Sequence, residues 1–105
     1  MERSPDQTQA SEALSAFAHA YELAEKAVEG EPDAHRAFES ATELTEAARQ
    51  ITIHLGKLRA LQAARIRDKE SLSLADLAKQ IRVSKTRAVQ MLEIADKARE
   101  GTDHG

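Results

Sequence analysis

Cationic side chains recur at short intervals between residues 79 and 90 of a chain whose overall net charge is negative. Polar side chains that donate or accept hydrogen bonds stand among them. The four cations of this segment are Lys79, Arg82, Lys85 and Arg87. Ammonium and guanidinium groups at this density attract polyanions, because each carries a positive charge and several N–H donors. These residue types therefore predict binding chemistry, and no nucleophile motif or glycine-rich phosphate loop accompanies them.

The charge of the chain is divided unevenly along its length. Residues 1–48 carry 11 acidic and 3 basic side chains, a net charge of −8. Residues 49–105 carry 7 acidic and 12 basic side chains, a net charge of +5. This asymmetry indicates that one end of the chain meets a polyanion and the other does not. Charge segregation also occurs on ordinary solvated helices, so charge alone does not identify nucleic acid.

Composition excludes several other classes of protein. Cysteine is absent, and the four histidines lack the spacing of a zinc site, so we expect no metal, no cofactor and no enzymatic activity. Aromatic residues make up 3% of the chain, too few for a surface that stacks single-stranded bases. No apolar run approaches the roughly 20 residues of a membrane helix, and the N-terminus lacks a secretory signal. We expect a cytoplasmic, nucleoid-associated protein without membrane contact.

Apolar spacing predicts two long helices in the first two thirds of the chain. From about Ala10 to Val28, and again from about Asp33 to Arg67, apolar residues follow a rhythm of three and four residues. Gly30 and Pro32 separate the two segments and provide stop and start signals. Because this link is short, the helices are expected to form an antiparallel hairpin.

The apolar stripe of this hairpin is broader than one partner helix covers. Two hairpins from two copies would bury it, which predicts a homodimer. Packing on the chain's own C-terminal helices is the alternative, and it is possible only for the part between Leu55 and Ile66. The residues expected at the dimer contact are Leu14, Phe17, Tyr21, Val28, Phe38, Leu44 and Ile51.

Residues 73–92 contain the sequence signals of two short helices that pack against each other. Ser73 is a good N-cap, and Ser84 is another at the start of the second helix. Ala78 is small where the two helices would cross, and Val83 supplies an apolar side chain in the turn. The expected buried faces are Leu74, Leu77, Ala78 and Ile81 on the first helix, and Ala88, Met91, Leu92 and Ala95 on the second.

This segment resembles the helix-turn-helix of bacterial repressors and of the sigma-factor region that reads promoter elements. The usual pattern is LAxxLGVSxxTVxxxL. It is matched at Leu77, Ala78, Ile81, Val83, Ser84 and Leu92. Arg87 and Ala88 replace its threonine and valine, and Arg82 replaces the glycine of the turn, a position that often has a positive φ. The match covers about 20 residues, or about 35 if Leu58–Arg67 serves as the first helix of a three-helix unit.

The resemblance implies that the helix over residues 84–99 lies in the major groove of double-stranded DNA. Lys85 and Arg87 would then donate to guanine, and Gln90 would bond adenine. Thr86 and Val89 would touch a thymine methyl group, and Ser84 would meet a phosphate. The cations expected near the DNA backbone are Lys79, Arg82, Arg65 and Arg67.

Together these patterns predict an all-α fold with an N-terminal antiparallel hairpin, whose long second helix runs into a C-terminal tri-helical helix-turn-helix unit. The expected divisions are a disordered N-terminus (1–9), a dimerisation hairpin (10–57), a DNA-binding unit (58–99) and a disordered tail (100–105). The expected function is that of a homodimeric, sequence-specific transcriptional regulator, a repressor rather than an activator. The alternatives are a helical adaptor that binds RNA polymerase or a sigma factor through its acidic hairpin, or a DNA-binding partition or antitoxin protein.

Overall fold

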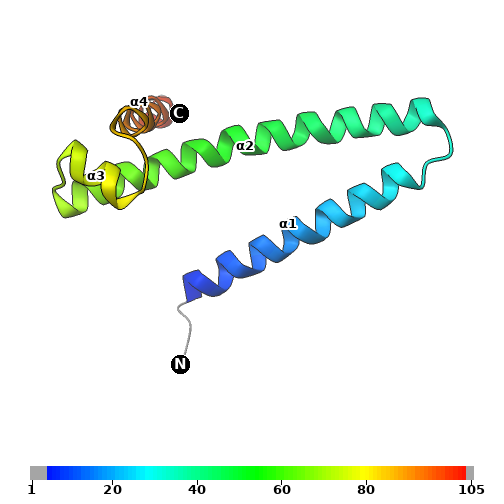
Figure 1. The fold of residues 1–105 in the computed structure, drawn as a ribbon, viewed down its shortest axis with the longest axis horizontal. Helices are drawn as coiled ribbons and strands as arrows, with labels where there is room; N and C mark the ends of the chain where they lie inside the picture. Colours follow the sequence, from blue (N-terminus) through cyan, green and yellow to red (C-terminus); the bar gives the residue numbers. More distant parts are fainter. Residues whose placement is uncertain (1–4, 104–105) are drawn as a thin grey trace. The chain divides into compact units, whose positions relative to one another are not determined.

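All the regular structure within residues 5–103, the part that this computed structural model describes, is α-helical. The elements in Figure 1 are α1 (Pro5–Glu29), α2 (Ala34–Glu70), α3 (Leu74–Gln80) and α4 (Lys85–Asp103). The predicted all-helical class is therefore confirmed. Among these described residues, no helix is long and apolar enough to cross a membrane.

The chain divides into two compact units, Met1–Ala48 and Arg49–Gly105, called here the N-terminal unit and the C-terminal unit. The sequence placed this boundary nine residues later, between residues 57 and 58. The observed boundary coincides with the change in charge, so the acidic segment is one unit and the basic segment is the other.

Both terminal helices extend further than the sequence predicted. α1 begins at Pro5 rather than near Ala10, so residues 5–9 are helical instead of disordered. Proline suits the first turn of a helix, because the N–H that it lacks would have no partner there. α4 continues to Asp103, beyond the predicted end at Arg99, and residues 100–103 are helical too. The expected disorder of residues 1–4 and 104–105 lies outside the described residues.

α2 has well-defined signals at both ends. Asp33 Oδ1 accepts hydrogen bonds from the backbone N–H groups of His35 (2.9 Å) and Arg36 (3.3 Å), which caps the first turn. At the other end, Ser71 has a φ of 51°, and the N–H of the following residue, Leu72, donates to the carbonyl of Arg67 at 3.0 Å. This left-handed cap ends the helix at Glu70, three residues beyond the predicted end at about Arg67.

The N-terminal unit consists of α1 and the first part of α2, joined through Gly30. The Gly30 N–H donates to the Lys26 carbonyl at 2.9 Å, and a Cβ at Gly30 would lie just 2.9 Å from that same oxygen. A larger residue would therefore crowd this turn. No side chain between residues 8 and 48 is buried, so this described part of the unit has no core of its own.

The core lies in the C-terminal unit, where the end of α2, α3 and α4 pack together. Alanine dominates it, which allows the helix backbones to approach closely. Two exposed contacts join the other helices to α2: Gln80 Nε2 donates to Glu70 Oε1 at 3.2 Å, and Arg99 lies 3.6 Å from Asp68. The buried residues are Ala60, Ala63, Ala64, Leu77, Ala78, Ala88, Met91 and Ala95.

Candidate nucleic-acid interface

α3 and α4 pack against each other through small and apolar side chains. Ser73 Oγ accepts from the Asp76 N–H at 3.1 Å and so caps α3, as predicted. Leu77 and Ala78 are buried, and the side chains of Leu74 and Ile81 are half-buried. The predicted buried face of this helix is confirmed.

The turn between α3 and α4 is a left-handed helix cap built on an arginine. Arg82 has a φ of 58°, and its N–H donates to the Lys79 carbonyl at 3.3 Å. The N–H of Val83 reaches back to the carbonyl of Ala78 at 3.0 Å. This pair of hydrogen bonds is the pattern that usually ends on glycine. The chain adopts it with a residue that has a Cβ, at a cost of roughly 1–2 kcal/mol.

Ser84 holds the start of α4. Its Oγ accepts from the Arg87 N–H at 3.0 Å, and its carbonyl accepts from the Ala88 N–H at 2.9 Å. The hydroxyl keeps its own proton as a donor to an acceptor outside the helix. The N–H groups of the first turn and the helix dipole also favour an anion at this end.

The two faces of α4 have opposite character. Ala88, Met91 and Ala95 are buried, and the sequence predicted all three. At about 100° per residue, Thr86 and Gln90 lie on the face opposite Ala88, and both are exposed. Packing on α3 therefore leaves the polar side of the first two turns of α4 open to solvent.

Every residue that the sequence assigned to DNA contact is exposed and belongs to the C-terminal unit. Eight of them lie on α3, α4 and the turn between these helices: Lys79, Arg82, Ser84, Lys85, Thr86, Arg87, Val89 and Gln90.

The remaining two, Arg65 and Arg67, are not brought together. Residues two apart on a helix point about 200° away from each other, so these arginines lie on nearly opposite sides of α2. The Arg65 guanidinium donates to Gln62 Oε1 of its own helix at 3.4 Å. A flat duplex surface cannot meet both side chains at once.

Sequence reasoning missed two residues on the outward face of α4. Glu93 and Lys97 are exposed and continue the line of Thr86 and Gln90 at intervals of three and four residues. A carboxylate at this place accepts from a cytosine amino group and repels phosphate. The same helical spacing that identified the buried face would have identified this one.

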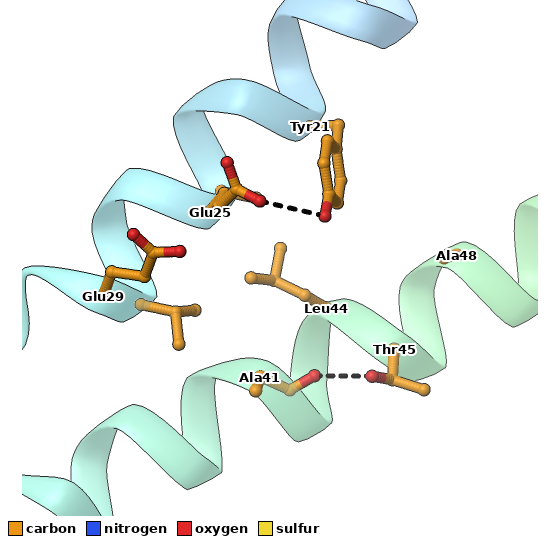
Figure 2. Close-up of a pocket in the computed structure, with 9 residues that line it drawn as sticks. Tyr21, Glu25, Glu29, Ala41, Leu44, Thr45 and Ala48 are labelled. Atoms are coloured by element: carbon orange, nitrogen blue, oxygen red, sulfur yellow. Dashed lines mark hydrogen bonds between the residues drawn. The ribbon is translucent and has the colours of Figure 1, made fainter.

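The residues predicted for dimerisation lie on α1 and α2, and most are exposed. Tyr21 and Val28 of α1 and Leu44 of α2 line an open groove of about 430 Å³ inside the N-terminal unit. Figure 2 shows Tyr21 and Leu44 pointing into it from opposite helices, and the Tyr21 hydroxyl donating to Glu25 Oε2 at 3.2 Å. This hydrogen bond, together with the negative charge of Glu25, raises the pKa of Tyr21 above its ordinary value. The groove is a gap in packing between two apolar faces.

The geometry of the C-terminal unit offers a capped, cationic helix start that is open to solvent. Among residues 5–103 no group of three or more acidic or histidine side chains is placed to hold a metal ion. No protein-family model matches this chain, no curated protein is significantly similar to it, and no solved structure matches it.

Proposed function

We propose that this protein binds double-stranded DNA in a sequence-specific manner and acts as a transcriptional regulator. The observation that carries the proposal is the exposed first turn of α4, which is capped by Ser84 and flanked by the cations Lys85 and Arg87. A major groove about 12 Å wide admits one α-helix. In this proposal α3 and α4 form a helix-turn-helix, and the end of α2 is its first helix.

Each exposed side chain then has a distinct role. Thr86 and Gln90 face base edges, where a glutamine can bond adenine through two hydrogen bonds. Lys85 and Arg87, at the sides of the same turn, donate to guanine or to phosphate. Arg82 lies in the turn before α4, where its guanidinium can reach the DNA backbone and add salt-dependent affinity.

The same proposal includes two copies of the chain and a repressor role. Large apolar side chains exposed on α1 and α2 support self-association, because contiguous apolar surface is costly to leave in water. Repression requires only that a site is occupied, so it needs no contact with the transcription machinery. Partition and antitoxin proteins bind DNA by the same chemistry and are alternatives within this proposal.

Selection of bound sites from random duplexes, followed by affinity measurements on the selected site, tests this function. Arg87→Ala should lower the affinity for the selected site by about 1–3 kcal/mol, which is roughly fivefold to 150-fold. Arg36→Ala is the matched control, since Arg36 is an exposed arginine of the N-terminal unit that pairs with Asp33 at 3.9 Å. A random duplex that binds as tightly as any selected site would contradict sequence-specific recognition.

A second candidate function is that of an adaptor for a protein partner. The observation in its favour is the N-terminal unit itself, which has a net charge of −8 and no buried side chain between residues 8 and 48. A basic surface on RNA polymerase or on a sigma factor would complement it. A purified chain that forms such a complex but has no affinity for DNA at low salt would favour this function over DNA binding.

A further inference from the structure

An apolar stripe runs along α2 and remains open to solvent. Its members recur every three or four residues on one face of the helix, with the small Ala48 between Leu44 and Ile51, in a seven-residue rhythm typical of paired helices. The exposed members are Leu44, Ile51, Leu55 and Leu58.

The chain's own helices do not cover this stripe in the C-terminal unit. Ala60, Ala63 and Ala64 form the side of α2 that packs into the core. Leu58 lies about 160° around the helix from Ala60, on nearly the opposite side. Leu55 and Leu58 are 47% and 54% exposed. Packing on α3 and α4 was the alternative to dimerisation for this part of the stripe, and it is wrong for these two leucines.

The charges of the two units indicate what covers the stripe. Two copies paired in parallel would bring their N-terminal units together, each with a net charge of −8. Two copies paired in antiparallel would instead bring each N-terminal unit toward the C-terminal unit of the other copy, which has a net charge of +5. The first arrangement is repulsive and the second attractive. An apolar stripe centred on the two-fold axis also complements itself.

We infer that two copies of this chain associate through antiparallel α2 helices, with the two-fold axis close to residues 51–53. Ile51 then lies at the centre of the contact, and Leu55 and Leu58 of each copy flank it. The charge change between the units sets the direction of pairing, and the apolar stripe supplies the buried surface.

This arrangement has a consequence for DNA binding that rests on the proposed function. Ala63, in the core contact beneath α4, lies 12 residues from Ile51 in the sequence, which is about 18 Å along a helix. The two-fold axis doubles this to about 36 Å between the core contacts of the two copies. Successive major grooves on one face of DNA are about 34–36 Å apart. The antiparallel pair therefore spaces two C-terminal units for adjacent half-sites.

Distances between spin labels test the direction of pairing in the absence of DNA. The chain has no cysteine, so Glu39→Cys, Thr52→Cys and Lys69→Cys each introduce a single thiol at an exposed position. The antiparallel pair predicts axial separations of about 40 Å at residue 39, near zero at 52, and about 50 Å at 69. Equal short distances at all three positions would mean parallel pairing and overturn the inference. The absence of any coupling would also overturn it and favour a different protein partner.

A matched pair of isoleucines tests the stripe separately. Ile51 and Ile53 are 44% and 41% exposed and lie on nearly opposite sides of α2. In sedimentation equilibrium, Ile51→Lys should raise the dissociation constant of the dimer at least tenfold, while Ile53→Lys should change it by no more than about twofold. Equal effects of the two substitutions would overturn the assignment of the stripe. An antiparallel dimer without DNA affinity would contradict the proposed DNA binding and leave this inference intact. A monomer that binds its site tightly would contradict this inference and the two-copy part of the proposed function, and would leave DNA binding intact.

Discussion

The two units of this chain are built from similar amphipathic helices, yet they differ in where their apolar side chains end up. In the C-terminal unit, small residues such as Ala60 and Ala88 are completely buried. In the N-terminal unit, large residues such as Leu14 and Phe17 remain mostly exposed. Burial therefore depends on how many neighbours a helix has: three helix segments enclose a core, and two leave a groove.

This difference implies two sources of stability. Burying one large apolar side chain contributes about 1.5–3 kcal/mol, and the N-terminal unit of a single copy forgoes most of that contribution. Its helices should therefore gain stability when two copies associate, and that stability should increase with protein concentration. The C-terminal unit has its core within one copy, so its stability should depend much less on concentration.

The largest effect on stability is expected from a substitution in the core of the C-terminal unit. Leu77 is the largest fully buried side chain among the described residues. Leu77→Ala should lower the free energy of unfolding of the C-terminal unit by about 2–5 kcal/mol through lost contacts and a cavity. Leu14→Ala is the matched control, because Leu14 is 71% exposed, and at a protein concentration that keeps the chain monomeric it should change stability by less than about 0.5 kcal/mol. Urea unfolding followed by circular dichroism measures both. Similar losses would show that the N-terminal unit has a core in the monomer.

An intermediate effect concerns the turn between α3 and α4. Arg82→Gly should raise the free energy of unfolding by roughly 1 kcal/mol, since glycine adopts a positive φ without strain. The same change removes a cation, so under the proposed function the affinity for all DNA sequences should fall and its dependence on salt should weaken. Arg82→Ala separates the two effects, because it removes the charge and keeps the strain. An unchanged free energy of unfolding in Arg82→Gly would show that contacts of the arginine side chain offset the cost of its positive φ.

The smallest expected effect lies in the groove of the N-terminal unit. Glu25→Gln should lower the pKa of Tyr21 toward its ordinary value, because the hydrogen bond and the negative charge that raise it both involve Glu25. The hydrogen bond contributes while the hydroxyl is protonated, and its contribution is lost as the pH rises through the raised pKa. The chain has one tyrosine and no tryptophan, so ultraviolet absorbance follows this titration directly. Glu22→Gln should leave the midpoint in place, and an equal shift in both variants would point to general charge rather than to this hydrogen bond.

Local signals allowed much of the C-terminal unit to be predicted from the sequence. Ser73 and Ser84 act as caps through hydrogen bonds to residues three positions away, and the turn at Arg82 adopts the conformation that its place in the pattern suggested. Such signals depend on a few neighbouring residues, so they can be predicted from a short stretch of sequence.

Other features depend on contacts that no short segment determines. The unit boundary at Ala48 and the exposure of Leu55 and Leu58 depend on which helices pack together. Apolar spacing identifies the apolar face of a helix, but it does not identify the helix that packs against that face. Helix ends without a strong stop signal, such as that of α4, were also misplaced. The opposite directions of Arg65 and Arg67, by contrast, follow from helical periodicity and could have been predicted.

Six of the eight buried residues that the structure describes in the C-terminal unit are alanines. Nearly every substitution at these positions enlarges the side chain, and excess volume in a close-packed core costs about 1–3 kcal/mol. The alanine positions of this core should therefore accept fewer substitutions than the equivalent positions of a leucine-rich core. The exposed side of α4 has no such constraint. The exposed residues Thr86 and Gln90 can therefore vary while the scaffold beneath them stays nearly invariant.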